Sequence, residues 1–327
     1  MKLFDSRWDG NHGIGRFSVE LFRRLHCFQR VQISGRPSDP IDPWRLGHYL
    51  RRVKPQLYFS PGYNAPIGVA CKCALTVHDL NHLRVKDNSS TLKRLYYTRI
   101  MRPALRRAEV IFTPSEFSKQ EILEWAGIKA DKLITLEPGI SELLGPCGEK
   151  YVSLRPYFLY VGNHSSHKNL EGAFEGFALS KLYLSHDFIV TGLPSKRMRA
   201  LLVTLNIIDK VRFVGVVNDM ALAALYRGAI AVVLVSFYEG FGLPIIESMA
   251  CGTPVLTSNL ASMPEVAGGA GFLVNPYSVE EIADGMRKLA VDDDLRRELT
   301  KKGLKWSGRY RWDDTAKTVD GALAKIV

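Results

Sequence analysis

Short apolar runs alternate with longer amphipathic segments along the whole chain, and this rhythm predicts alternating strands and helices. Runs of three to five apolar residues suit buried strands, because a strand covered on both faces shows no polar alternation. Strands that alternate with helices pack as a parallel, doubly wound α/β sheet. The expected strands cover residues 56–60, 74–77, 110–113, 133–136, 157–161, 187–190, 211–214, 231–235, 254–257 and 272–274.

Apolar residues at helical spacing predict several helices, three of them well marked. The first follows a glycine-containing loop at residues 9–16, and the second covers 91–108. We expect an interruption of the second at Pro103, because proline lacks the N–H that a helix interior needs. The third covers about 312–327. The apolar faces consist of Phe17, Leu21 and Leu25 in the first helix and of Ala316, Val319, Leu323 and Ile326 in the last.

A polar stretch with glycine and proline, residues 145–150, is the best candidate for a linker. Strands and helices follow one another in a similar order on both sides of it, which predicts two Rossmann-like domains. We place the first at 1–149, the second at 150–308 and a closing helix at 309–327. With 327 residues, of which 46% are hydrophobic and 24% charged, the chain is able to bury two such cores.

Positive charge is concentrated in the first half of the chain. The formal net charge is +11, and residues 1–150 contain 24 basic and 15 acidic side chains. A basic half implies an anionic partner such as nucleic acid, an anionic membrane face or a phosphorylated acceptor. Basic and aromatic residues share the segment 93–107, which is typical of a helix at a membrane surface, although a solvated basic face has the same composition. No nucleic-acid-binding motif accompanies the charge, so we expect no nucleic-acid partner.

The five cysteines are an odd number without framework spacing, which fits a reducing compartment. Cys71 and Cys73 lack a second pair of ligands, so we expect no metal site there. Residues 1–5 lead into a short strand pattern rather than into a secretory signal. Because no apolar run approaches the roughly 20 residues that span a bilayer, we expect a cytoplasmic protein with at most a peripheral contact at the inner face of the plasma membrane.

The most specific chemical signal is a pair of glutamates, Glu239 and Glu247, on either side of a glycine-rich turn. An apolar strand leads into Gly240 and Gly242, which allow the backbone to approach a ligand closely. Pro244 suits the first turn of a helix whose free N–H groups face an anion. We expect Glu247 in that first turn, and both carboxylates are able to accept hydrogen bonds from the vicinal hydroxyls of a sugar. The alternative is an ordinary strand–turn–helix with solvated glutamates.

This stretch resembles the signature of retaining glycosyltransferases of the GT-B fold, family four, also called glycosyl transferases group 1. The resemblance implies that Glu239 contacts the donor sugar and Glu247 the ribose of a nucleotide-sugar. It implies two Rossmann-like domains that face a central cleft, with the acceptor on the first domain and the donor mainly on the second. It also implies a closing helix that crosses back to the first domain. The loop that would bind the sugar and phosphate through backbone amides comprises Gly240, Phe241, Gly242 and Leu243.

A second similarity to the family lies in residues 162–169. There Lys168 would neutralise the donor diphosphate as a point charge, and a surface lysine is the alternative. Many members carry an arginine directly after the glycine of this segment, whereas this chain has Asn163, which we include among the donor-binding residues. Arg16 and Arg197 are candidates for the missing partner of the diphosphate. The Gly-Asn and His-Lys-Asn variants look closest to mannosyl- and rhamnosyltransferase-like members.

Glycines mark two further segments of the expected donor site. Gly13 and Gly15 resemble the first-domain glycine loop of the family, which approaches the donor diphosphate or the acceptor. A lone Gly-x-Gly is a weak signal, and a plain turn is the alternative. Gly215 and Val216 match a segment whose backbone groups meet the nucleobase. We assign Arg16, beside the first loop, to the acceptor side.

His78 and Asp79 follow an apolar strand and therefore lie at a sheet edge. With the leucine that follows, they are similar to the His-Asp-Leu of several mannosyl- and related transferases, in which the histidine lies near the transferred sugar. His78 would orient a sugar hydroxyl or stabilise charge that develops on the donor sugar, and a histidine satisfied at the interdomain surface is the alternative. We assign Asp79 and Ser115 to the acceptor side, although each also suits a helix N-cap.

These features predict a retaining, metal-independent glycosyltransferase in which His78, Lys168 and Glu239 have catalytic roles. The expected donor is a nucleotide-sugar, with GDP-mannose as the best choice. The expected acceptor is a hydroxyl of a glycan or lipid-linked glycan in bacterial surface polysaccharide biosynthesis, such as LPS O-antigen or capsule. We expect no other cofactor, because Lys168 and helix-terminus amides supply positive charge at the diphosphate. In the mechanism that the resemblance implies, the leaving diphosphate oxygen helps to deprotonate the acceptor on the same face of the sugar.

Two other classes of function remain open. A nucleotide-sugar epimerase or a phosphorylase on a similar two-domain fold would act without an acceptor glycan. A non-catalytic basic binding protein would tolerate Glu239→Ala without functional loss, and its binding would follow the charge of the first domain. A dehydrogenase is disfavoured, because no complete dinucleotide fingerprint follows a strong strand.

Overall fold

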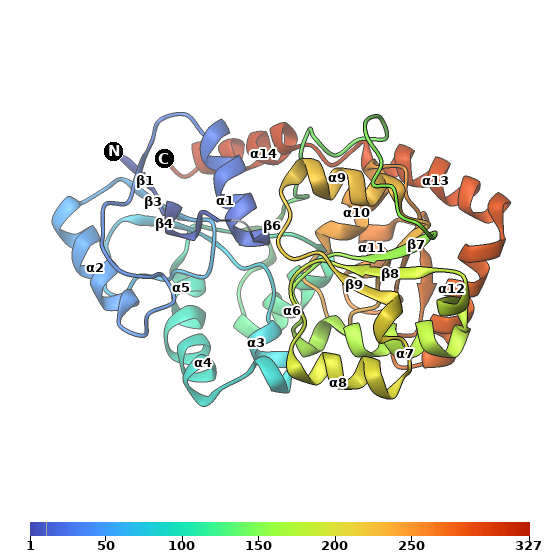
Figure 1. Ribbon diagram of the computed structural model, residues 1–327. Coiled ribbons are helices and arrows are strands. Elements are labelled where there is room, and N and C mark those ends of the chain that lie inside the picture. Colours follow the sequence, from blue (N-terminus) through green and yellow to red (C-terminus); the bar gives the residue numbers. More distant parts are fainter. Residues whose placement is uncertain (11) are drawn as a thin grey trace. The chain divides into compact units, whose positions relative to one another are not determined.

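The chain folds into two compact units, each built around its own six-stranded parallel sheet (Figure 1). A computed structural model describes residues 1–10 and 12–327. Unit 1 comprises Met1–Gly139 and Arg311–Val327, and unit 2 comprises Ile140–Tyr310.

The first division between the units falls ten residues before the position 149/150 expected from composition. Residues 140–149 associate with unit 2, where Arg227 donates hydrogen bonds to the carbonyl oxygens of Gly145 and Glu149. The chain returns to unit 1 at Arg311, so the last helix and the N-terminus belong to the same unit.

Unit 1 contains a parallel sheet of strand order β2-β1-β3-β4-β5-β6. Parallel neighbours need crossover connections, and most of these connections are helical. The strands are β1 (Lys2–Phe4), β2 (Phe28–Arg30), β3 (Leu57–Ser60), β4 (Lys72–Thr76), β5 (Val110–Thr113) and β6 (Leu133–Thr135). The helices are α1 (Gly13–Arg24), α2 (Asp42–Val53), α3 (Asn81–Arg84), α4 (Thr91–Tyr96), α5 (Arg102–Arg107), α6 (Glu116–Ala126) and α14 (Trp312–Ala324).

Successive residues of these strands serve two separate cores, because side chains alternate between the faces of a sheet. Phe59 packs with α1 and α14, while its neighbour Tyr58 packs on the opposite face with α2 and α6. Phe17 of α1 and Trp312 of α14 meet edge to face with ring centroids 6.0 Å apart. Figure 1 shows these two helices on the same face of the first sheet. The closing segment of the chain is therefore part of the core of unit 1.

The helical region expected at 91–108 covers residues 91–107, and its regular α-helix is interrupted just before Pro103 rather than at it. A π-helical turn, Tyr97–Met101, joins α4 to α5, and Pro103 is the second residue of α5. The change in hydrogen-bond pattern lies directly before the proline. A regular α-helix would need an N–H from Pro103 in this turn, and proline has none.

Unit 2 contains a parallel sheet of strand order β12-β11-β10-β7-β8-β9 around one continuous core. In Figure 1, α7 and α8 lie on one face of this sheet and α9 and α10 on the other. The strands are β7 (Tyr157–Tyr160), β8 (Asp187–Val190), β9 (Val211–Phe213), β10 (Ala231–Leu234), β11 (Val255–Ser258) and β12 (Phe272–Val274). The helices are α7 (Leu170–Ser180), α8 (Lys196–Thr204), α9 (Asp219–Gly228), α10 (Leu243–Ala250), α11 (Met263–Ala267), α12 (Val279–Val291) and α13 (Asp293–Ser307).

Each sheet has a point at which the strand order reverses. In unit 2 the chain builds β7, β8 and β9 outward in one direction, then returns to place β10 on the other side of β7. In unit 1 the reversal lies between β1 and β3. Loops that follow the two central strands diverge at such a point and leave a crevice, which is where open α/β sheets bind ligands. The topology therefore predicts ligand sites at the loops after β7 and β10 in unit 2, and at those after β1 and β3 in unit 1.

Candidate functional site

Lys168 and Glu239 meet at the reversal point of the second sheet. Lys168 ends a 3₁₀ turn (Ser166–Lys168) that follows β7, and Glu239 lies in the loop that follows β10. Because β7 and β10 are paired neighbours, their two loops leave the same edge of the sheet side by side. The Lys168 Nζ lies 2.6 Å from Oε1 and 2.7 Å from Oε2 of Glu239. Two predicted catalytic side chains, chosen from separate motifs, are thus in direct contact.

Hydrogen bonds to both ends of Glu239 hold it in place. The Ser236 hydroxyl donates to Oε1 over 2.8 Å, and the Ser262 hydroxyl donates to the Glu239 carbonyl over 2.9 Å. Ser262 also donates to the carbonyl of Phe241, so the loop is anchored at two points. Only 7% of Glu239 is exposed. A nearly buried carboxylate needs partners, and here an ammonium group and a hydroxyl supply them.

The glycine-rich turn leads directly into α10. Gly242 caps this helix with φ of 96°, a left-handed conformation that glycine adopts without steric cost. Pro244 occupies the first turn, as the sequence predicted. The N-terminus of the helix and the partial positive charge of its dipole therefore point to the side of the sheet where Lys168 and Glu239 lie.

Glu247 is the fifth residue of α10 and so begins the second helical turn, not the first as we expected. The helix begins one residue before Pro244, which moves Glu247 further along it. Its carboxylate accepts a hydrogen bond of 2.8 Å from the hydroxyl of Tyr226, a fully buried residue of α9. Sequence reasoning missed Tyr226, which lies on another element and carries no motif.

The two candidates on unit 2 for an additional diphosphate contact have partners elsewhere. The Asn163 side chain is exposed, and its Oδ1 accepts from the backbone N–H of Ser165. Arg197 forms an exposed ion pair of 2.8 Å with Glu171. A contact of either side chain with the diphosphate therefore stays a prediction.

Asn169, the residue after Lys168, ties three loops of unit 2 together. Its side-chain amide donates to the carbonyl oxygens of Val235 and Pro276, over 3.0 and 2.8 Å. These bonds fix the start of α7 and, with it, the position of the Lys168 backbone.

Gly215 and Val216 lie just after the edge strand β9. Gly215 has φ of 69° and forms an isolated antiparallel bridge with Gly192, through bonds of 2.7 and 3.2 Å. The Val216 side chain is exposed. The structure thus gives this segment a left-handed turn with open space beside it, and leaves its contact with a base as a prediction.

On unit 1, His78 follows β4 and is held by backbone and aromatic contacts. Its Nε2 lies 2.8 Å from the carbonyl oxygen of Pro61, and Phe17 and Tyr63 pack edge-on against the ring. Desolvation lowers the pKa of His78 below its ordinary value, so the ring is neutral at pH 7. A carbonyl oxygen only accepts hydrogen bonds, which places the proton of the neutral ring on Nε2. Nδ1 then has a lone pair that is suited to accept a hydrogen bond from a hydroxyl.

Asp79 and Ser115 both act at helix N-termini. Asp79 Oδ1 accepts from the backbone N–H of Asn81 over 2.9 Å and from the hydroxyl of Tyr63 over 3.1 Å. Ser115 is the N-cap of α6, and its hydroxyl accepts from the N–H of Ser118 over 3.1 Å. Ser115 therefore has the capping role that we considered, whereas the N-cap of α3 is Leu80 and Asp79 lies one residue before it. A role of either residue toward an acceptor stays a prediction.

Gly13, Gly15 and Arg16 belong to the first turns of α1 rather than to a free loop. His12 caps this helix, since its Nδ1 accepts from the N–H of Gly15 over 3.0 Å. A Cβ on Gly15 would lie 2.3 Å from the carbonyl oxygen of Gly10, so close packing of the backbone requires glycine here. Sequence reasoning missed His12, because histidine is not among the residue types that are usual at an N-cap.

A buried polar network at the reversal point of the first sheet was also missed. Arg7 donates to the carboxylates of Asp5 and Asp42, each over 2.7 Å, and Asn64 donates to both carboxylates over 3.3 Å. Burial opposes the charged form of Arg7, but hydrogen bonds to the two aspartates raise the pKa of its guanidinium. The network anchors the loop after β3, which also contacts the segment after β4. Asp5, directly after β1, was the available signal.

Comparisons with known proteins agree with this architecture. The model of the glycosyl transferases group 1 family matches residues 152–306, and that of glycosyltransferase family 4 matches residues 3–142. The O-antigen chain mannosyltransferase B of Escherichia coli is 30% identical to the chain, over 94% of this chain and 95% of that protein. The chain belongs to the glycosyl transferases group 1 family.

A second curated relative and one solved structure are also similar to the chain. The O-antigen chain mannosyltransferase RfbU of Salmonella typhimurium is 29% identical, over 77% of this chain and 69% of that protein. The structure of sucrose-phosphate synthase from Thermosynechococcus elongatus matches with a TM-score of 0.81 at 18% identity, and covers 99% of this chain and 98% of that chain. This glycosyltransferase has the GT-B fold that its sequence predicted.

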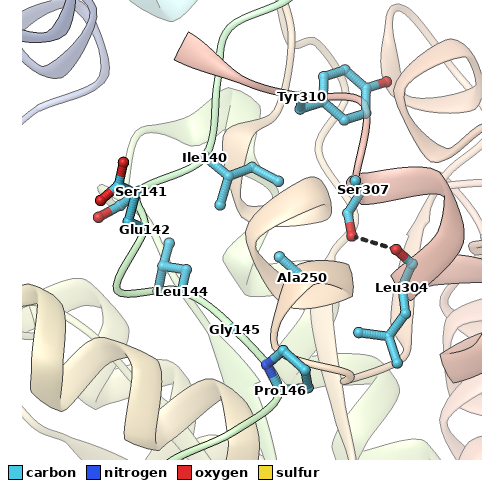
Figure 2. A pocket seen from close by; sticks show the side chains of 11 residues that line it. Ile140, Ser141, Glu142, Leu144, Gly145, Pro146, Ala250, Leu304, Ser307 and Tyr310 are labelled. Atoms are coloured by element: carbon cyan, nitrogen blue, oxygen red, sulfur yellow. Dashed lines mark hydrogen bonds between the residues drawn. The ribbon is translucent and has the colours of Figure 1, made fainter. Parts of the chain in front are cut away.

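One cavity of this group 1 glycosyltransferase lies away from the predicted site (Figure 2). It measures about 410 Å³ and lies between residues 140–146, Ala250 at the end of α10, and the end of α13 with Tyr310. Its described lining includes no predicted site residue. It is open and mostly apolar, and it contains no cluster of converging polar groups of the kind that orients a nucleotide-sugar.

The described residues include neither a candidate metal site nor a candidate membrane span. Over 1–10 and 12–327, no three His, Cys, Asp or Glu side chains are grouped so that they could hold a metal ion. In that same part of the glycosyltransferase, every helix is too short or too polar to cross a bilayer.

Proposed function

We propose that this glycosyltransferase is a retaining enzyme that transfers mannose from GDP-mannose to a hydroxyl of a glycan or lipid-linked glycan. The observation that carries the proposal is the Lys168–Glu239 contact at the reversal point of the second sheet, beside the N-terminus of α10. The similarity to two O-antigen chain mannosyltransferases supports mannose as the sugar and bacterial surface polysaccharide as the product.

In this proposal each part of the donor has a partner on unit 2. Lys168 and the amides of Phe241, Gly242 and Leu243 bind the diphosphate and sugar, since an ammonium group and a helix N-terminus both favour anions. Glu239 accepts hydrogen bonds from hydroxyls of the sugar. Glu247, preset by Tyr226, accepts from the ribose. Gly215 and Val216 meet the base through their backbone.

The chemistry proposed is a same-face displacement. As the bond between the anomeric carbon and the diphosphate oxygen breaks, negative charge develops on that oxygen, and Lys168 stabilises it electrostatically. The same oxygen takes the proton of the acceptor hydroxyl, which then bonds to the anomeric carbon with retention. Neutral His78 accepts a hydrogen bond from a sugar hydroxyl through Nδ1 and so orients the ring. These charges need no metal ion, and we propose a metal-independent enzyme.

We propose that unit 1 binds the acceptor and meets the anionic inner face of the plasma membrane. The α4 segment exposes 58% of Leu92 and 52% of Leu95, next to Lys93 and Arg94. A short helix that exposes both apolar and basic side chains is suited to an anionic bilayer surface. Arg16, Asp79 and Ser115 stay the proposed acceptor-side residues.

A thermal-shift panel tests the donor site first. GDP, UDP, dTDP and ADP, with their common sugar conjugates, are added to the wild type and to Glu247→Ala. A ligand that binds the folded state raises the free energy of unfolding by mass action, by up to a few kcal/mol at large excess, and so raises the melting temperature. We expect GDP and GDP-mannose to stabilise the wild type but not the variant.

Transfer itself is tested with radiolabelled GDP-mannose and a lipid-linked glycan extract, with and without EDTA. Product with an α-linkage, formed in EDTA, is the expected result. When inorganic phosphate replaces the acceptor, release of mannose 1-phosphate and GDP would instead identify a phosphorylase. An epimerised nucleotide-sugar formed without any acceptor would identify an epimerase. A folded protein that responds to no nucleotide would favour a non-catalytic binding protein.

A further inference from the structure

The two charged groups at the centre of the donor site satisfy each other. Both carboxylate oxygens of Glu239 lie within 2.7 Å of the Lys168 Nζ, and the side chains of Glu239 and Lys168 are only 8% and 17% exposed. An ammonium group has three N–H donors, so two directed at Glu239 leave one for any other acceptor. Within the described part of the chain, the carboxylate also accepts from the Ser236 hydroxyl.

We propose that Glu239 makes the site discriminate against the nucleoside diphosphate product in favour of the nucleoside diphosphate-sugar. The inference rests on the proposed function, in which Lys168 faces the diphosphate. Glu239 thereby acquires a second task beyond contact with the sugar, because it weakens the binding of the molecule that must leave after transfer.

The sign of this effect follows from charge. Without the sugar, the terminal phosphate has one more ionisable oxygen, whose pKa is about 6, so the product carries an extra negative charge at neutral pH. That charge lies close to Lys168 and hence close to Glu239. Two like charges repel more strongly in a site that excludes water than in bulk solvent.

Hydrogen bonding acts in the same direction. When the diphosphate binds, Lys168 turns N–H groups from Glu239 toward the phosphate. If a sugar is present, its hydroxyls donate to Glu239 and replace the hydrogen bonds that are lost. When only the diphosphate is present, a nearly buried carboxylate loses part of its ammonium contact and gains no hydroxyl. A buried charge that loses a partner costs free energy. This cost weakens the binding of the product but not that of the donor.

Calorimetric titration of GDP and GDP-mannose into the wild type and Glu239→Gln tests this role. Glutamine keeps the size of the side chain and removes its charge. We expect GDP to bind about 5- to 10-fold more tightly to the variant, and GDP-mannose to bind more weakly. Glu298→Gln, which removes the same charge from an exposed ion pair with Lys302 in the same unit, should leave the ratio of the two affinities within about twofold of wild type.

The outcomes separate this inference from the proposed function. If the wild type binds neither GDP nor GDP-mannose, the proposed donor is wrong and the inference falls with it. If the wild type binds both, and Glu239→Gln binds GDP no more tightly than the wild type, the donor site stands and only the inference is overturned. An equal gain of GDP affinity in Glu298→Gln would also overturn it, since net charge alone would then account for the effect.

A double-mutant comparison covers the case in which Glu239→Gln does not fold because Lys168 loses its partner. Lys168→Gln/Glu239→Gln replaces the ion pair by two amides that still bond to each other. Relative to Lys168→Gln alone, the double variant should bind GDP at least about threefold more tightly, which isolates the contribution of the Glu239 charge. Equal or weaker GDP binding by the double variant would contradict the inference.

Discussion

The hydroxyl of Tyr226 donates a hydrogen bond to the Glu247 carboxylate, and both side chains are buried. In Tyr226→Phe the carboxylate loses this donor in surroundings where water is scarce. We expect the free energy of unfolding to fall by about 1–2 kcal/mol, and nucleotide affinity to fall about 3- to 10-fold. Urea unfolding and calorimetric titration measure the two quantities.

Tyr157→Phe is the matched control for that change. Tyr157 is also buried, and its hydroxyl donates to the carbonyl of Leu225 over 2.8 Å, so a comparable loss of stability is expected. Nucleotide affinity should stay unchanged in this variant. An equal loss of affinity in both variants would mean that Tyr226 acts only through general stability.

The neutral state of His78 predicts a pH dependence of stability. Desolvation holds the pKa of His78 below its ordinary value in the folded protein, although Asp79 nearby acts in the opposite direction. The folded state therefore binds fewer protons than the unfolded state at mildly acidic pH, and stability falls as the pH drops below about 6.5. Above that pH the contribution is fully present.

His78→Gln isolates this contribution, because glutamine donates to the Pro61 carbonyl but does not titrate. His82 and His186, whose pKa values burial also lowers, remain in both proteins and cancel in the difference. The difference in unfolding free energy, wild type minus variant, should be constant from about pH 7 to 8 and decline toward pH 5. A difference that stays flat over this whole range would rule out a neutral, desolvated His78.

At the scale of the element, α10 depends on the conformation of its capping residue. Gly242→Ala places a Cβ 3.1 Å from Ile245 and forces a non-glycine residue to φ of 96°. We expect a loss of about 1–2 kcal/mol in unfolding free energy and at least a tenfold loss of nucleotide affinity, because the loop amides move with the cap. Gly269→Ala, at φ of 74° with open space around the Cβ, should lose similar stability with no loss of affinity.

Local sequence patterns identified most strands but not their order. Strands β5, β8 and β12 begin and end at the expected residues, because each is a short, mostly apolar run between clear breaks, although β12 is partly exposed. Strand β2 was missed, since its three residues are half-exposed or exposed at a sheet edge and show no apolar run. Lys168 and Glu239 were selected independently, yet their contact spans 71 residues and depends on β10 pairing with β7. Single-chain patterns do not encode that pairing, nor the position of Tyr226 beside Glu247.

For the whole molecule, the basic character of unit 1 predicts salt-dependent binding to anionic vesicles. Each Lys or Arg near such a surface contributes about 1 kcal/mol, so Lys93→Gln/Arg94→Gln should weaken binding about 30-fold at low salt. Co-sedimentation with phosphatidylserine vesicles measures it, and about 0.5 M salt should abolish it. The control, Lys301→Gln/Lys305→Gln in α13, removes equal charge from unit 2. If both double variants weaken vesicle binding equally, α4 is not the membrane-binding surface.

The return of the chain to unit 1 has a consequence for biosynthesis. Strands β1 to β6 leave the ribosome first, but the face that carries Phe17 and Phe59 is covered only when Trp312, Val319 and Leu323 emerge, after the whole of unit 2. Unit 2 has all of its residues by Tyr310 and is able to fold as a whole while unit 1 still exposes an aromatic surface. Translation therefore completes the second unit before the first. Until then, the exposed aromatic surface of unit 1 is the part of the nascent protein that most needs a chaperone.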